Sequence, residues 1–467
     1  TYSQNKYDNV PLGDDGNEYS GVLTAAIRAN PATPVYDSNG DYYIDPKRST
    51  VPNAVSLLDI ADKTVKDRIL GSAFIIAKPV KGLELKATFG ADRKFQKRSN
   101  YLPKTTLEGK RNNGSAYINQ EDVCDYLMEL TANYSKTFKE HSLKVLGGYS
   151  FQKFTGTGVS AGNTEFMMDG FSYNNMGAGG GAKPSVASWA WKNSIGSYFA
   201  RINYMYANRY LFEATVRADG ASNFTPENRW GYFPSASLGW VMSEERFMEK
   251  TRSWLSNLKW RFSYGQTGNS NVGNHVNSAY TVGYNYILGG SEMNGVFAHK
   301  LGNPSLTWET TSEFNIGLDL GLFDNRIRLT AEYFNRRITD LLVTNKPLLS
   351  YNEVNTIAAN AGSTQSQGIE ITLNTTNISK KYFTWSTTLT LAHYNDRWLT
   401  RAADWKPESY QKVNDPIRAW WSYESLGLLQ VGEKAPNAQK DLLPGQVKLK
   451  DRNNDGVIGP DDMVYVD

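Results

Sequence analysis

The stretch "YFARINYMYANRYLFEATVRA", Tyr198 to Ala218, contains two alternating segments separated by a very short gap. Apolar side chains occupy every second position of the first segment, at Tyr198, Ala200, Ile202, Tyr204 and Tyr206. Arg201 and Asn203 fall between them. A period of two over nine or more residues predicts a long strand with one apolar and one polar face. The gap at Ala207-Asn208 leaves room only for a tight hairpin turn.

The same alternation recurs along the chain, for example in "LELKATFGA" (83–91) and "RIRLTAEYF" (326–334). It predicts about a dozen strands, over 70–77, 83–91, 125–136, 142–151, 195–206, 209–218, 233–242, 258–266, 312–322, 326–336, 367–375 and 382–393. Several are longer than the usual strand of about 5–6 residues. They match the roughly 9–11 residues that a tilted strand needs to cross a bilayer.

The gaps between these segments alternate between short and long. "DNR" at 324–326 is tight, whereas the predicted loops over 152–194, 337–366 and from 394 onward are long. One gap, 243–257, carries a predicted short helix. Tight turns on one side and long loops on the other are typical of an up-and-down barrel in an outer membrane. The fold predicted from the residues is therefore an all-β, transmembrane antiparallel β-barrel.

The amino-acid composition limits the classes of function that this chain can have. The mean hydropathy is −0.51, and no apolar run is long enough for a membrane-spanning helix. The net charge of +3 is scattered without a basic run, so we expect no nucleic-acid partner. The single cysteine, Cys124, excludes an internal disulfide and is interpreted as structural. Because the chain begins at Thr1 without a leader, we expect it to be part of a longer, processed protein.

Catalytic motifs are absent from the sequence. The four histidines form no HExxH motif or close pair, and no GxSxG elbow occurs. "GAGGG" at 177–181 lacks the Lys-Ser/Thr of a phosphate loop and is predicted to lie in a polar, flexible loop. We assign no catalytic residue and predict that the protein is not an enzyme.

Several longer stretches carry a family resemblance. "RYLFEATVRADGASNFTPENRWGYFPSASLGWVMSEERFM" (209–248), "LKWRFSYGQTGN" (258–269) and "PGQVKLKDRNNDGVIGPDD" (444–462) resemble the SusC-like TonB-dependent transporters (SusC/RagA family) of Bacteroidetes outer membranes. The resemblance implies a 22-stranded barrel with a plug domain that imports glycans, oligosaccharides or peptides with TonB-derived energy. It also implies a SusD-like surface lipoprotein as a lid, and dimers of transporter–lid pairs.

Within that family the whole of 1–467 is predicted to be part of the barrel. Its strands would run over roughly 70–393, and its long extracellular loops would include 394–467. No plug domain or TonB box lies in this sequence, and a dozen strands cannot close a barrel of 22. Two alternatives stay open: a surface receptor or adhesin barrel that does not transport, and a soluble carbohydrate-binding β-sandwich protein.

The segment "DRNNDGVIGPDD" (451–462) resembles a calcium loop of the type D-x-[DN]-x-[DN]-G. The predicted ligands are Asp451, Asn453, Asp455, the backbone carbonyl of Val457, and Asp462. Asp replaces the usual Glu at the last position, and the flanking residues are β-like, so this is not an EF-hand domain. Two interpretations remain: a bound Ca²⁺ and a solvated Asx-rich turn.

Aromatic residues in "AWWSYES" are candidates for substrate contact. Trp420, Trp421 and Tyr423 lie in the long segment after 393. Exposed aromatic rings stack on the apolar C–H faces of sugar rings. The alternative is that these rings pack within the loop.

Overall fold

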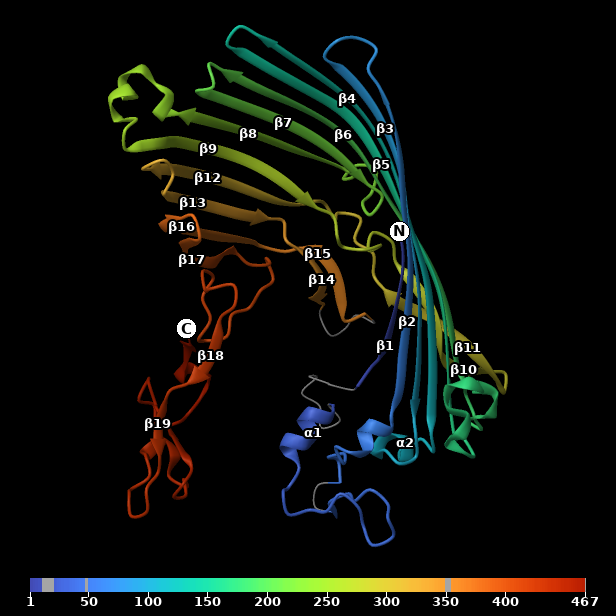
Figure 1. Cartoon of the computed structure of the whole chain (residues 1–467). Coiled ribbons are helices and arrows are strands. Elements are labelled where there is room, and N and C mark those ends of the chain that lie inside the picture. Colours follow the sequence, from blue (N-terminus) through green and yellow to red (C-terminus); the bar gives the residue numbers. More distant parts are fainter. Residues whose placement is uncertain (11–20, 47–48, 349–353, 467) are drawn as a thin grey trace. The chain divides into compact units, whose positions relative to one another are not determined.

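The computed structural model describes residues 1–10, 21–46, 49–348 and 354–466, and β-strands dominate it (Figure 1). Thirteen strands form one sheet in the order β1-β2-β3-β4-β5-β6-β7-β8-β9-β12-β13-β16-β17. These strands are β1 (Tyr2–Asp8), β2 (Ala61–Ala77), β3 (Leu83–Leu102), β4 (Ser115–Phe138), β5 (His141–Thr164), β6 (Ser185–Tyr206), β7 (Tyr210–Ala221), β8 (Trp230–Val241), β9 (Leu255–Asn269), β12 (Glu309–Leu322), β13 (Ile327–Thr339), β16 (Ser363–Lys380) and β17 (Phe383–Thr400).

Four small two-stranded sheets lie outside the large sheet in the described part of the chain. They pair β10 (Ala279–Leu288) with β11 (Ser291–Lys300), β14 (Leu342–Pro347) with β15 (Thr356–Asn360), β18 (Trp420–Tyr423) with β21 (Met463–Val466), and β19 (Ser425–Leu428) with β20 (Val447–Leu449). The helices are short: α1 (Val22–Arg28), α2 (Leu107–Arg111), and the 3₁₀ turns η2 (Ser56–Asp59), η3 (Asp169–Asn174), η4 (Met176–Ala178), η5 (Met242–Glu244), η6 (Arg246–Thr251), η7 (Asn437–Gln439) and η8 (Pro460–Asp462). None of the described helices is long and apolar enough to cross a membrane.

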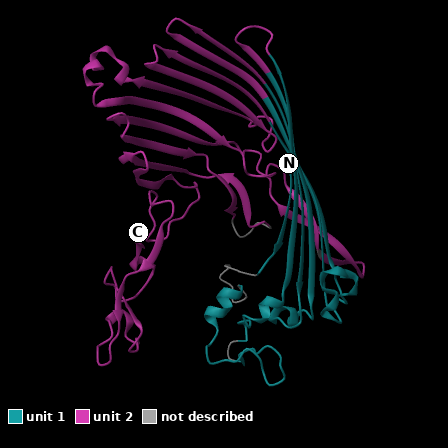
Figure 2. Cartoon of the chain, viewed as in Figure 1, with its two compact units in different colours: residues 1–77, 86–130, 150–195 teal, residues 78–85, 131–149, 196–467 magenta. Residues whose placement is uncertain are grey.

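The chain divides into two compact units (Figure 2). Unit 1 consists of residues 1–77, 86–130 and 150–195, and unit 2 consists of 78–85, 131–149 and 196–467. In unit 1, β1 pairs antiparallel with β2. In unit 2, neighbouring strands from β7 to β17 pair antiparallel in the sheet order.

Strand register confirms the two-faced pattern in unit 2. Between β8 and β9, Leu238 lies opposite Phe262 and Trp240 opposite Trp260, whereas Ser237 lies opposite Ser263. Large apolar side chains therefore share one face, and small polar ones share the other. The turn at Ala207-Asn208 is as tight as predicted, and both residues have the positive φ of a type I′ hairpin turn.

All twelve predicted strands occur, but several are much longer than predicted. β3 continues from the predicted end at 91 to Leu102, β5 continues from 151 to Thr164, and β6 begins at Ser185 instead of 195. The loop predicted over 152–194 was therefore wrong in extent and is confined to 165–184. Beyond the apolar band both faces of these strands carry polar residues, so the alternation that marks a strand in sequence is lost there. The helix predicted in 243–257 is present as η5 and η6.

Most large apolar side chains on the sheet are exposed rather than buried. Ile75, Tyr232 and Leu391 are 69%, 67% and 56% exposed. A small buried cluster in unit 1 contains Phe166 and Tyr101, whose rings meet edge to face at 5.5 Å. The sheet thus presents an apolar face that the described part of the chain leaves uncovered, as a lipid-facing wall would.

Candidate functional site

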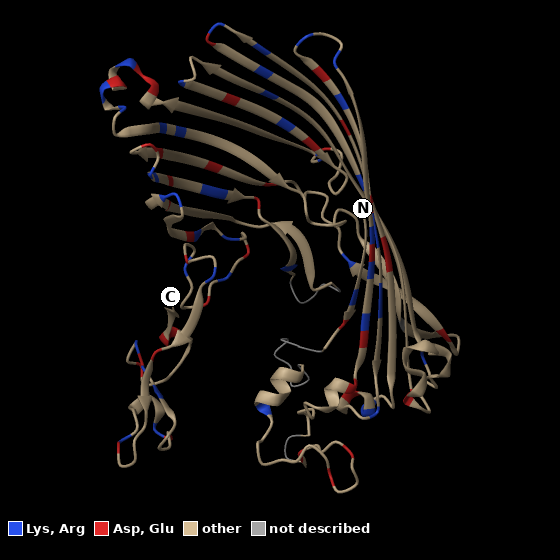
Figure 3. Cartoon of the chain, viewed as in Figure 1, with Lys and Arg blue, Asp and Glu red and all other residues tan. Residues whose placement is uncertain are grey.

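Charged residues recur along the strands of unit 2 (Figure 3). Arg261 on β9 is the centre of one network. Its Nε donates to Asp319 Oδ2 of β12 at 2.9 Å, and its Nη2 donates to Glu332 Oε1 of β13 at 2.5 Å. One guanidinium thus links three adjacent strands, and it balances two carboxylates that would otherwise repel each other.

Small side chains create hollows on the same face. A cavity of about 550 Å³ lies beside Arg261, and Lys144, Glu213 and Lys259 contribute its charges. A second cavity of about 660 Å³ shares Glu213 with the first and extends to Glu313 and Arg336. The small residues that leave these hollows open include Ser235, Ser237, Ser263 and Gly265. The surface offers hydrogen-bond donors and acceptors together with side chains of both charges, which suits a polar solute.

Sequence reasoning did not single out these cavity residues. The alternation of small residues in "YFPSASLGW" (232–240) is the signal that could have found them, because it predicts a polar face with no bulky side chains. Their convergence with Glu213 and Arg261 depends on strand register.

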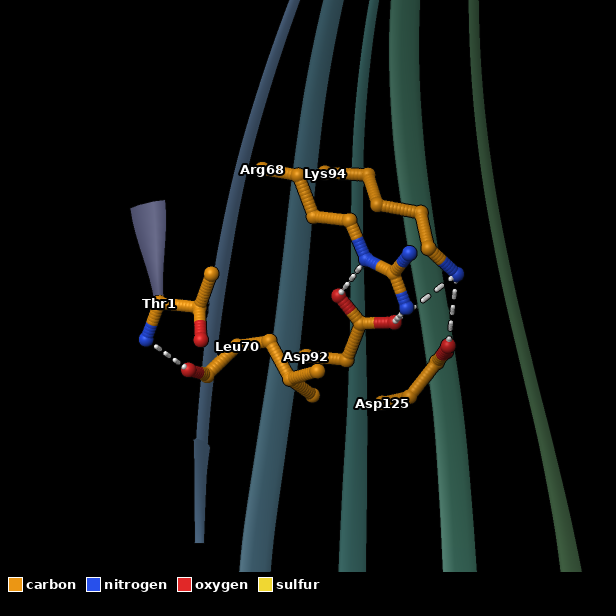
Figure 4. Close-up of polar contacts among 6 residues, drawn as sticks. All are labelled: Thr1, Arg68, Leu70, Asp92, Lys94 and Asp125. Carbon is orange, nitrogen blue, oxygen red and sulfur yellow. Dashed lines mark hydrogen bonds and ion pairs between the residues drawn. The ribbon is translucent and has the colours of Figure 1, made fainter. Parts of the chain in front are cut away.

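Unit 1 carries a comparable polar ladder across β2, β3 and β4 (Figure 4). Arg68 donates to both oxygens of Asp92, each at 2.8 Å. Lys94 lies 3.2 Å from Asp92 and 3.3 Å from Asp125. Further along the same strands, Arg98 makes a two-pronged contact with Asp62, whose side chain is only 8% exposed. The ladder neutralises charge along one face of these strands.

The predicted calcium loop folds into a turn stabilised by its own side chains. Asp451 Oδ2 accepts the amide of Gly456 at 2.8 Å, and Asp455 Oδ1 accepts the amide of Val457 at 2.8 Å. Asn453 Oδ1 accepts the amide of Asp455 at 3.0 Å. One side-chain oxygen of each of the first three predicted ligands is therefore occupied by a backbone amide of the turn.

Some contacts of this loop suit a bound cation and others do not. Asp451 Oδ1 is buried without a hydrogen-bond partner, so one oxygen is available for an ion. Asp462 is fully buried and its two oxygens accept the amides of Arg452 and Gly459, at 2.7 and 2.9 Å. Those amides lower the pKa of the Asp462 carboxyl. Among the residues that the structure describes, no three His, Cys, Asp or Glu side chains are grouped so that they could share a metal.

The predicted aromatic contacts do not form a single surface. Trp420 and Trp421 are neighbours on β18, so their side chains point to opposite faces. Trp420 is 73% exposed. Trp421 packs against Tyr410 and Tyr465, with ring centroids 5.1 and 6.1 Å away, and Tyr423 is half-buried on the same strand. Trp421 therefore holds the β18–β21 pair together, and of the three predicted residues only Trp420 offers a free ring.

Comparisons of this sequence with known proteins all find the same kind of protein. The family model "TonB dependent receptor-like, beta-barrel" matches residues 4–431. TonB-dependent receptor P3 of Formosa agariphila is 30% identical over 95% of this chain and 46% of its own length. TonB-dependent receptor SusC of Bacteroides thetaiotaomicron is 32% identical over 67% of this chain and 31% of its own length. The chain spans about half the length, or less, of the curated relatives it matches.

A solved structure agrees on the fold. The structure of the RagAB peptide transporter covers 100% of this chain and 51% of its own chain, with a TM-score of 0.81 at 21% identity. At that identity the likeness establishes the strand arrangement only.

Proposed function

Because this chain belongs to the TonB dependent receptor-like β-barrel family, we propose that it forms part of the wall of an outer-membrane importer. The cargo is a bulky nutrient, a glycan, oligosaccharide or peptide, and TonB supplies the energy. The observation that carries the proposal is the two-faced sheet. One face exposes large apolar side chains, and the other carries ion pairs and the hollows beside Arg261.

Two aromatic clusters in unit 2 support a membrane position for this wall. Tyr198 lies between Tyr149 and Trp230, with ring centroids 4.9 and 6.1 Å away. At the C-terminal end of β6, Tyr206 lies between His141 and Tyr210, with ring centroids 4.9 and 6.2 Å away. Eight residues of strand separate the two tyrosines, which is about 26 Å along the strand and about 20 Å along the normal for a tilt of roughly 40°. That span fits between the two aromatic girdles of an outer-membrane barrel.

Partners follow from the same assignment. We propose a SusD-like surface lipoprotein as a lid, contact with TonB through a plug domain, and dimers of such pairs. The relatives named SusC and RagAB motivate this part of the proposal. Because RagAB is a peptide transporter, both peptides and glycans are candidate cargo for this chain.

The loop 451–462 is proposed to bind a cation, with Ca²⁺ as the candidate. Asp451, Asn453, Asp455, the Val457 carbonyl and Asp462 would hold it, and the role would be to stiffen the loop. The unpartnered Asp451 Oδ1 supports this proposal. Calcium titration of the full-length protein should show binding that Asp451→Ala with Asp455→Ala abolishes, while assembly of the barrel is unaffected. Failure of that variant to assemble would refute a role confined to the loop.

The proposed function is tested by uptake in cells that produce the full-length protein. Labelled oligosaccharides and peptides are offered to cells with and without functional TonB. The expected result is accumulation of one substrate class that requires both the protein and TonB. Surface binding with no uptake would favour the receptor or adhesin alternative. Extraction of the protein without detergent would contradict any membrane function.

A further inference from the structure

Two tryptophans at the start of β6 lie flat on glycines of the neighbouring strand β5. A methyl group built on Gly158 would lie 2.2 Å from Cζ2 of Trp189, and one built on Gly156 would lie 2.3 Å from Cε2 of Trp191. Any side chain at either glycine would displace the indole. The two rings are therefore seated directly on the backbone, about 7 Å apart along one face of β6.

These rings belong to the polar face of unit 1. A methyl group on Gly162, which shares its face of β5 with Gly156 and Gly158, would point to the Tyr117 ring at 3.3 Å. Tyr117 lies eight residues before Asp125 on β4, so both side chains share one face, and Asp125 contacts Lys94 of the charge ladder. The tryptophans therefore lie on the face of the charge ladder, opposite the apolar face of the same strands.

A glycine of β5 covers one side of each indole ring, and the other side remains accessible to a ligand. Trp189 and Trp191 are 36% and 38% exposed. Within the described ranges, neither indole N–H has a hydrogen-bond acceptor. Each residue thus presents a flat apolar surface and an unused donor at its edge, in a face that is otherwise polar.

Polar groups on β4 flank this surface. Thr155 contacts the carbonyl of Cys124, and Gly162 faces Tyr117, which together define one register between β4 and β5. That register puts Glu121 opposite Gly158 and Asn119 opposite Ser160. The Glu121 carboxylate is therefore the polar group of β4 that lies nearest to the Trp189 ring, because Gly158 between them has no side chain.

We propose that Trp189 and Trp191, with Glu121 at their edge, form a binding subsite for pyranose rings of a glycan. The apolar C–H face of a sugar stacks on each indole, and its hydroxyls donate to Glu121 and accept from the indole N–H groups. The carboxylate of Glu121 favours neutral sugars over uronates. This inference rests on the proposed import function, because it makes the polar face the path of the cargo.

The test uses the full-length protein in detergent and a panel of neutral hexasaccharides of glucose, mannose, xylose and galactose. A galacturonate hexasaccharide and a pool of hexapeptides complete the panel. Calorimetry should detect one neutral glycan, and Trp189→Leu with Trp191→Leu should weaken it at least tenfold. Leucine keeps the glycines covered, and heat-modifiable gel mobility checks that each barrel is folded. Trp189→Phe with Trp191→Phe should recover most of the affinity. Trp254→Leu, an exposed tryptophan in a turn, is the control.

Unchanged glycan affinity in the folded leucine variant would overturn the subsite, as would equal affinities of the leucine and phenylalanine variants. Binding of peptides alone would also overturn it. TonB-dependent uptake with an unaffected leucine variant would refute the subsite and leave the import function standing. Loss of glycan affinity in that variant without TonB-dependent uptake would support the subsite and refute import.

Discussion

The pair Asp62–Arg98 should contribute more to stability than a pair of matching geometry on the same strand. Arg98 contacts Asp62 at 3.0 and 2.5 Å, and Arg93 contacts Asp122 at the same two distances. The carboxylates differ in burial: the Asp62 side chain is 8% exposed and that of Asp122 is 30% exposed. Both arginines follow the apolar alternation of β3, which ends at residue 91. Arg93 and Arg98 are five residues apart and lie on opposite faces of β3, so the two pairs differ in burial and in the face that they occupy.

Removal of Arg98 leaves a buried carboxylate without its cation. Hydrogen bonds to charged groups contribute about 1.5–3 kcal/mol, and an exposed pair contributes about 0.2–1 kcal/mol. Because the Arg98 side chain is 53% exposed, solvent reduces the loss, and we expect about 2 kcal/mol for Arg98→Met. Arg93→Met should cost about 0.5 kcal/mol. The measurement is guanidinium unfolding of the full-length protein in detergent, followed by tryptophan fluorescence.

The pH dependence gives an independent check. Burial opposes ionisation of Asp62, but hydrogen bonds from Arg98 and Asn9 outweigh it, so the pKa of Asp62 lies below its ordinary value. Its contribution to stability is therefore present above the unfolded pKa of about 3.9 and is lost as pH falls through the folded pKa. Without Arg98 the pKa of Asp62 rises, so Arg98→Met should lose less stability than the parent between about pH 6 and pH 3. Equal losses from Arg98→Met and Arg93→Met, together with identical pH slopes, would refute the reasoning.

Three further predictions concern other contacts. Phe166→Ala should destabilise the unit 1 cluster by about 3 kcal/mol, because it empties a fully buried site, and limited proteolysis should then cut within 165–184. Asp462→Ala should speed hydrogen exchange of the Arg452 and Gly459 amides, because its carboxylate accepts both of them. These amides also lower the pKa of Asp462, so acidification below about pH 3.9 should loosen the same turn in the parent protein. Arg261→Met should lower the unfolding midpoint, because Asp319 and Glu332 then repel each other, and adding Asp319→Asn should restore part of the loss; no recovery would contradict this account.

Local pattern was enough to predict twelve strands of the large sheet, whereas β1 and the β10–β11 hairpin were not predicted. "LELKATFGA" (83–91) and "YFARINYMY" (198–206) alternate without interruption, and both lie inside observed strands. The tight turn at Ala207-Asn208 was predicted because two residues can close only a hairpin. The family was identified from long stretches such as 209–248, and the family model match confirms it.

The outer halves of the long strands could not be predicted from the sequence alone. In "KRSNYL" (97–102) polar residues occur on both faces, so no period of two distinguishes the strand from a loop. Only pairing with neighbouring strands satisfies its backbone amides and carbonyls, and that pairing is a property of the sheet. For the same reason the sequence predicted a loop over 152–194, although strands β5 and β6 extend into it. Trp189 and Trp191 were therefore assigned to a loop rather than to a strand.

The sequence by itself determined what kind of sheet this chain forms. Its strands have one apolar and one polar face, their connections alternate between short and long, and they belong to a family of outer-membrane receptors. These features are local, because side chains alternate along each strand whatever its partners. Tertiary structure alone decided which side chains meet. It brought Arg261 to Asp319 and Glu332 from three strands, packed Trp421 against Tyr410 and Tyr465, and seated Trp189 on Gly158. Those contacts depend on strand register, and a shift of one residue would send every side chain of a strand to the other face.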